Sequence, residues 1–264
     1  MIVDRFKLYE GAVILLSSLF VLGVFFDVFL MFDISLGLIF FVFLYLYLTE
    51  SERKSKAFMG FLWAFFIGQI YAVVMELIHL IDSYFGNAPS VRHAPYVGNM
   101  PFVIAYISLI VHMVRDFNFS QLIKRFKYHL LVLVVFNVYA IITLNRMVLE
   151  AEFFNVHTLA FLFESIYNSC ILLVLSFSLL NYIYHETKAS SLLLLGSMCI
   201  VFSEMVQVTY FFIPANIETI ELPYDLITIG RILHITYSLL LILGFYFIYR
   251  YMLVCIKLKL KLDL

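Results

Sequence analysis

Long, uninterrupted apolar runs constrain this chain more than any other feature of its sequence. A helix of roughly 20 apolar residues crosses a bilayer whose hydrocarbon core is about 30 Å thick. Runs of about that length cover residues 10–27, 29–49, 57–82, 100–114, 128–145, 157–184, 190–213 and 226–252. We therefore predict a single integral membrane domain over residues 1–264. Its expected fold is an all-α, polytopic transmembrane helix bundle with about eight spans.

Composition and motifs exclude several other classes of protein. Hydrophobic residues make up 64% of the chain and charged residues 13%, whereas soluble domains have about 45–50% and about 25%. The net charge of −1 argues against nucleic acid as a partner, because phosphate binding requires an excess of Lys and Arg. Glu76 and His79 form one Glu-x-x-His element, but a di-metal carboxylate bundle needs two. We predict no metal and no cofactor, and membrane lipid as the partner.

The basic residues alternate between the connections in a way that predicts the orientation. Lys and Arg concentrate in the cytoplasmic connections of membrane proteins. One side of the predicted bundle receives Arg5, Lys7, Arg53, Lys54, Lys56, Arg115, Lys124, Arg125, Lys127, Lys188, Arg250, Lys257, Lys259 and Lys261. The other side receives only Arg92, Arg146 and Arg231. This pattern predicts a multi-pass protein of the cell membrane with both termini in the cytoplasm.

Polar residues recur along one face of five predicted spans. Residues three, four or seven apart share a helix face. The stripes are Gln69, Glu76 and His79; Ser108 and His112; His157, Glu164 and Asn168; Ser197, Glu204 and Gln207; and Arg231, His234 and Ser238. An ionisable group in the hydrocarbon core costs a few kcal/mol even on the milder scales, so such groups usually face the bundle interior. We predict that these stripes line one hydrated cavity.

Each polar residue also has a purely structural interpretation. An isolated histidine in an apolar helix is often only a hydrogen-bonded packing residue, and a protonated carboxyl can join two helices. Glu164 and Glu204 lie deepest in their spans, which favours a functional role. Burial disfavours the charged form of Glu204. Its expected hydrogen-bond partners are Ser203, Gln207 or a residue of the third span, with Arg231 as the nearest cation.

Two segments of the chain resemble one another. GFLWAFFIGQ at 60–69 is similar to GSMCIVFSE at 196–204, since both begin with Gly and end an apolar run in a polar residue. Each is followed by a loop containing proline and by a helix with His, Ser and Tyr. Residues 60–112 and 196–244 are therefore predicted to form an internal parallel repeat.

These residues resemble the YhhN, or lysoplasmalogenase-like, family of eight-helix membrane proteins. That family has a Gly-Asp pair in the third helix, a nearby helix ending in Ala-His, and a later helix with Gly and Ser-Asp. The corresponding residues here are Gly68-Gln69, Val111-His112, Gly196 and Ser203-Glu204, with Ser238 and Gly244 in the last helix. The sequence departs from the family in that Gln69 and Glu204 replace the two aspartates, and the second span lacks Lys-Pro.

The resemblance implies a hydrolase that cleaves the vinyl-ether bond of a lysophospholipid. Such a reaction needs a protonated acid and a group that orients water. In this interpretation Glu204 is the acid, Gln69 or Glu76 positions water, and His112 assists or binds the head group. Substrate contacts would come from Glu164, Asn168, Ser203, Gln207, Arg231, His234 and Ser238.

Two other functions stay open. The loss of one carboxylate, at Gln69, also fits a non-catalytic membrane sensor, a lipid-binding protein or a subunit of a membrane assembly. Parallel repeats and charges near the membrane midplane suit a transporter, which at 264 residues would need to form a homodimer.

Overall fold

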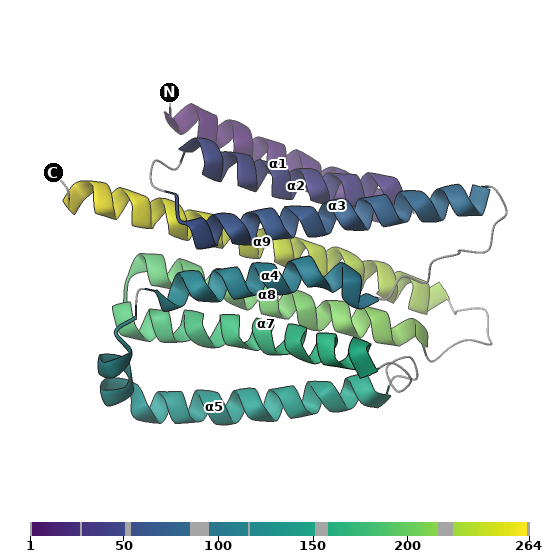
Figure 1. Cartoon of the computed structure of the whole chain (residues 1–264). Helices are drawn as coiled ribbons and strands as arrows, with labels where there is room; N and C mark the ends of the chain where they lie inside the picture. The colour runs from purple at the N-terminus through teal and green to yellow at the C-terminus, as the bar shows by residue number, and fades with distance from the viewer. Residues whose placement is uncertain are drawn as a thin grey trace.

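Eight helices make up the described part of the molecule (Figure 1). The computed structural model describes residues 2–26, 28–50, 54–84, 95–115, 117–150, 158–215 and 224–262. The helices are α1 (Ile2–Phe25), α2 (Phe29–Glu50), α3 (Lys56–Tyr84), α4 (Pro95–Val114), α5 (Phe119–Glu150), α7 (Thr158–His185), α8 (Lys188–Ala215) and α9 (Tyr224–Leu262). No strand occurs among these residues. The prediction of an all-α bundle is confirmed.

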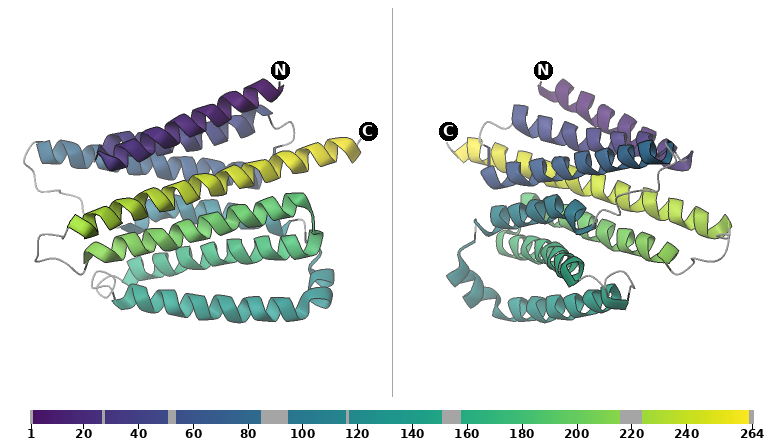
Figure 2. Two further views of the ribbon diagram at one scale, coloured as in Figure 1. Left: turned by 180° about the vertical axis from the view of Figure 1, so that it is seen from behind. Right: turned by 45° about the vertical axis from the view of Figure 1, so that its right-hand side comes forward.

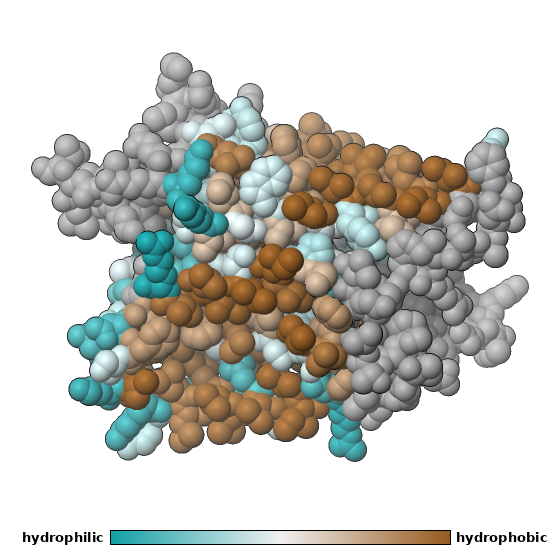
Figure 3. Space-filling model, viewed as in Figure 1, coloured by the Kyte–Doolittle hydropathy of each residue, from teal (hydrophilic) through white to brown (hydrophobic). Residues whose placement is uncertain are grey.

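The helices have the lengths and surfaces of membrane spans. Within the described residues, six of them are long and apolar enough to cross a bilayer, namely α2, α3, α5, α7, α8 and α9. The apolar parts of α1 and α4, Tyr9–Phe25 and Gly98–Val114, are shorter. Figure 3 shows a hydrophobic band across the visible face, with hydrophilic side chains gathered at its left edge. Exposed Leu, Ile, Val and Phe side chains of this kind suit contact with lipid.

The helices run alternately up and down the bundle. In Figures 1 and 2, α1, α3, α5 and α8 begin at the end where both termini lie, and α2, α4, α7 and α9 return to that end. The predicted basic connections therefore share one end with the two termini. This arrangement is the one that an even number of spans requires.

Reporter fusions should distinguish the two ends of the bundle. A reporter at Ser55 or Lys188 is expected to read cytoplasmic, because basic connections are retained on that side. Reporters at Ala94 and Glu218, which lie outside the described residues, should read external. A cytoplasmic signal at Ala94 would overturn the orientation inferred from the basic residues.

The helix neighbours repeat from the first half of the chain to the second. Helix α1 packs on α2, α2 on α3 and α3 on α4, and in the same way α5 packs on α7, α7 on α8 and α8 on α9. The halves join where α4 contacts α7 and where α9 contacts α1 and α2. Corresponding helices run in the same direction (Figure 1). The predicted repeat at 60–112 and 196–244 thus corresponds to the pairs α3–α4 and α8–α9.

Small residues at matching positions bring the helices of each pair together. A Cβ added to Gly196 would lie 2.9 Å from the Gly244 carbonyl oxygen, and one added to Gly244 would lie 3.0 Å from that of Gly196. A Cβ on Gly60 would lie 3.3 Å from Ser108 Oγ. Gly60 and Ser108 are as far apart in the sequence as Gly196 and Gly244. Close backbone approach at small residues is a common way for membrane helices to associate.

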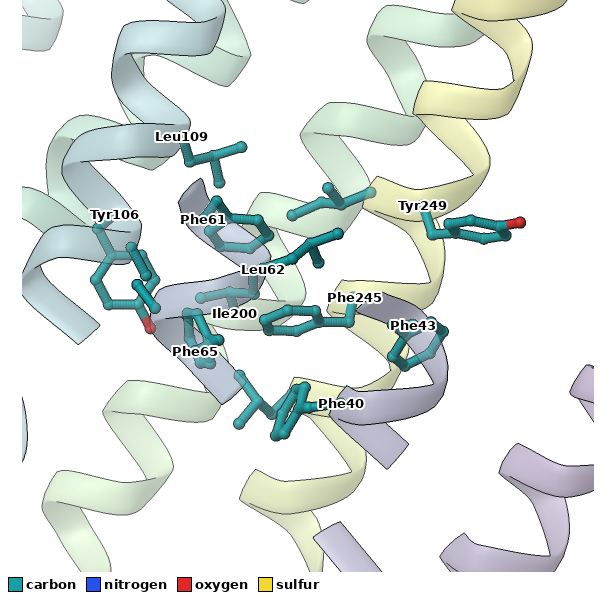
Figure 4. Packing of buried hydrophobic residues seen from close by; sticks show 14 of the residues in the cluster. Phe40, Phe43, Phe61, Leu62, Phe65, Tyr106, Leu109, Ile200, Phe245 and Tyr249 are labelled. Atoms are coloured by element: carbon teal, nitrogen blue, oxygen red, sulfur yellow. The ribbon is translucent and has the colours of Figure 1, made fainter. Parts of the chain in front are cut away.

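Aromatic rings fill the space between the halves (Figure 4). The Phe245 ring of α9 lies 4.6 Å from the rings of both Phe40 and Phe65 and stacks on Phe61 at 5.0 Å, measured between centroids. Phe40 comes from α2, and Phe61 and Phe65 come from α3. This cluster fixes α9 against α2 and α3, and so fixes the α8–α9 pair relative to the first half.

Candidate functional site

Glu204 of α8 is held by two tyrosines from other helices. The Tyr106 hydroxyl of α4 donates to Glu204 Oε1 at 2.5 Å, and the Tyr167 hydroxyl of α7 donates to Oε2 at 2.6 Å. Only 8% of the Glu204 surface is exposed, and both tyrosines are buried. The three side chains form a compact cluster inside the bundle, which we call the Glu204 cluster.

Packing fixes the orientation of each member of the Glu204 cluster. The Tyr106 ring meets the Tyr167 ring at 5.8 Å and the edge of Phe65 at 5.5 Å. Beside Glu204, the Ser203 hydroxyl donates to the backbone carbonyl of Tyr237 in α9 at 2.6 Å. This bond sets the rotation of α8 about its axis, which directs Glu204 toward α4 and α7.

The hydrogen bonds of Glu204 differ from those expected from the sequence. Its partners in the described part of the chain are the two tyrosines, and they are not Ser203, Gln207 or Arg231. A carboxylate can accept both phenolic protons, one on each oxygen. A protonated Glu204 donates its own hydroxyl, so one phenol must then accept and turn its proton elsewhere. The arrangement can therefore pass a proton through a tyrosine.

A second carboxyl group lies near the cluster on α7. Glu164 is close enough to Glu204 for the two groups to interact electrostatically. The Asn99 amide of α4 donates to Glu164 Oε2 at 3.3 Å, and Asn168 is buried one residue after Tyr167. Glu204 and Glu164 are thus the predicted site residues that the structure brings together, Ser203 precedes Glu204 in α8, and Asn168 is buried in α7.

Gln69 and Glu76 of α3 were predicted to act together with Glu204. Gln69 is buried, and Glu76 is half-buried about 10 Å further along the helix. Glu76 instead interacts electrostatically with Asp33 of α2. The structure shows no hydrogen bond from either residue to Glu204 within the described part of the chain.

His112 lies near the end of the bundle that holds the termini. Its Nδ1 atom is 3.0 Å from the Ser55 hydroxyl, which precedes α3. Its ring packs against Phe58 and Tyr251 at 5.7 and 6.2 Å. Tyr106 lies six residues earlier on α4, which corresponds to about 9 Å along the axis. His112 thus joins the start of α3 to α4 and makes no hydrogen bond to the Glu204 cluster.

The predicted site residues of α9 are not among the hydrogen-bond partners of Glu204. The His234 ring contacts Phe20 of α1 and Phe32 of α2, at 5.7 and 4.8 Å between centroids, and stacks on Tyr237. Ser238 is fully buried, while Arg231 is only half-buried, as is Gln207 of α8. Two pockets lined by described residues contain none of the predicted site residues. The contacts of the predicted residues thus fall into several small groups among the described residues, and the shared cavity stays a prediction.

Sequence reasoning did not identify Tyr106, Tyr167, Asn99 or Asp33 as site residues. The chain has 18 tyrosines, and the sequence alone does not show which two of them reach Glu204. A weak signal exists for Tyr167, because it lies between Glu164 and Asn168 within one helical turn. Asp33 had a clearer signal, since it is an ionisable residue inside the second apolar run, 29–49.

Comparisons of this chain with known proteins found no match. No family model matches the chain, and no curated protein or solved structure is significantly similar to it. The fold and its apolar helices define the class, a polytopic α-helical membrane protein.

Proposed function

We propose that the chain is a membrane hydrolase that cleaves the vinyl-ether bond of a lysophospholipid, as the lysoplasmalogenase-like family does. The observation that carries this proposal is the buried carboxyl of Glu204 with a phenol on each oxygen. Vinyl-ether hydrolysis begins with proton transfer to carbon. That step needs an acid that keeps its proton at neutral pH, and desolvation favours the protonated form of a carboxyl group.

The Glu204 cluster would act as follows. The protonated carboxyl gives its proton to one tyrosine, whose own hydroxyl proton moves to the β-carbon of the vinyl ether. Water then adds to the resulting oxocarbenium ion. The hemiacetal collapses to the fatty aldehyde and the glycerophosphate ester of the head group, whose glycerol hydroxyl is now free, and the proton released from water returns to Glu204. Glu164, held by Asn99, is the second carboxyl group available, and we assign it the activation of water.

A comparison of two substrates tests this chemistry. The purified protein in detergent should release an aldehyde from a lysoplasmalogen. It should release none from the saturated alkyl-ether lysolipid with the same head group, because a saturated ether has no carbon that can be protonated in this way. Equal cleavage of both lipids would contradict the mechanism.

A different observation favours a second candidate function. The Glu204 cluster joins α4, α7 and α8 in the interior, and neither described pocket contains it. A buried, fully hydrogen-bonded carboxyl can act solely as a link between helices. In that case the chain is a non-catalytic sensor, lipid-binding protein or subunit. The parent protein would then hydrolyse no lysolipid at all.

A further inference from the structure

A groove separate from the Glu204 cluster opens between α1 and α9. Its volume is about 880 Å³, and it is lined by α1, α2 and α9. The buried side chains of Phe43 and Leu46 form its floor, while Ile14 and Leu243 form exposed parts of its walls. Figure 2 shows α1 and α9 diverging toward the end that holds the termini. Because Ile14 and Leu243 are exposed, the groove is reached from the side, where the hydrocarbon of the bilayer would lie.

The length of the groove matches one leaflet. Its lining on α1 extends from Tyr9 to Leu22, which corresponds to about 20 Å of helix. Half of a hydrocarbon core about 30 Å thick is roughly 15 Å. An acyl chain of one leaflet would thus lie along the groove for its full depth.

Charged side chains occur only at one end of the lining. Arg250 Nη1 lies 3.6 Å from Glu10 Oε1 and donates to the Tyr246 hydroxyl at 3.1 Å. The same Tyr246 hydroxyl donates to Glu10 Oε1 at 3.3 Å. The side chains of Arg250 and Glu10 are 48% and 45% exposed. An ion pair this long and this exposed contributes little, so both groups can exchange it for a charged ligand.

We propose that this groove binds one glycerophospholipid whose head group carries a primary ammonium. Its phosphate would be bound by the Arg250 guanidinium, which presents paired N–H donors that suit phosphate oxygens. Its ammonium would be bound by Glu10, and one acyl chain would lie over Phe43 and Leu46. The opposite charges at the polar end complement a zwitterion, and they would not suit the apolar face of a second helix. This lipid is a resident ligand, distinct from the proposed substrate, since no residue of the Glu204 cluster lines the groove.

Native mass spectrometry of the full chain in detergent tests the proposal. The probes are phosphatidylethanolamine, phosphatidylglycerol and phosphatidylcholine. The parent should retain one phosphatidylethanolamine in preference to the other two. Arg250→Gln should weaken this binding about tenfold or more, the effect of losing a charge-assisted hydrogen bond. Glu10→Gln should remove the preference for ethanolamine over glycerol and leave phosphate-dependent binding.

Two further variants show whether lipid binding depends on the groove itself. Ser17 lines the apolar part, so Ser17→Trp should fill the groove and reduce binding of all three lipids while the helical content stays unchanged. Arg115→Gln removes the same charge after α4, outside the groove, and should leave binding as in the parent. Equal retention of phosphatidylethanolamine by the parent, Arg250→Gln and Ser17→Trp would overturn the proposal. So would a dimer in which a second copy of the chain excludes lipid.

Discussion

Replacement of Glu204 by glutamine is expected to lower lysoplasmalogen hydrolysis by about a hundredfold or more, the usual contribution of general acid catalysis. Glutamine keeps the shape of the side chain and one acceptor oxygen, so Tyr106 or Tyr167 can still donate to it. It has no proton that can be transferred to the substrate. The loss should therefore appear in turnover, measured as aldehyde released per minute, while the protein stays folded.

A matched control uses the same chemical change elsewhere. Glu186 is exposed between α7 and α8, so Glu186→Gln should hydrolyse the substrate as the parent does. Both variants should elute as the parent does in size-exclusion chromatography. Unchanged hydrolysis by Glu204→Gln would exclude Glu204 as the acid, whereas a parent protein without activity would favour the non-catalytic function.

The fold was largely predictable because its causes are local in the sequence. A span requires about 20 apolar residues wherever it lies, so hydropathy alone located the eight helices. The short fourth run, 100–114, is part of a helix that begins earlier, at Pro95. The sequence signal failed there because Gly98 and Asn99 interrupt the apolar run. A helix can nonetheless include them, since its backbone groups bond to one another whatever the side chain.

The candidate site was only partly predictable because it depends on how the helices pack. Glu204 and Glu164 could be identified by the cost of burying an ionisable group. Tyr106 and Tyr167 could not, since their hydroxyls reach Glu204 only through the contacts of α4 with α7 and of α7 with α8. His112 and His234 are residues that the sequence assigned to the site but that the structure places elsewhere. Spacing placed each on a polar face, but neighbouring aromatic rings surround them at separate places in the bundle.

The Gly196–Gly244 crossing should be highly sensitive to a single added methyl group. In Gly196→Ala the new Cβ would lie 2.6 Å from Ile248 Cγ1 and 2.9 Å from the Gly244 carbonyl oxygen. A side-chain atom can rotate away, but a backbone oxygen moves only if α8 and α9 separate. We expect a loss of about 1–3 kcal/mol in the free energy of unfolding, which is typical of overpacking.

Gly37→Ala on α2 is the matched control, because a Cβ added to Gly37 meets nothing within 4 Å. The same exchange there should leave stability unchanged or raise it by up to about 1 kcal/mol, since alanine favours the helix over glycine. Equilibrium unfolding of the purified variants in detergent micelles measures both effects. Gly196→Ala and Gly244→Ala obstruct the same crossing, so their double variant should lose less than the sum of the two. Equal stability of Gly196→Ala and Gly37→Ala would show that the crossing does not depend on its glycines.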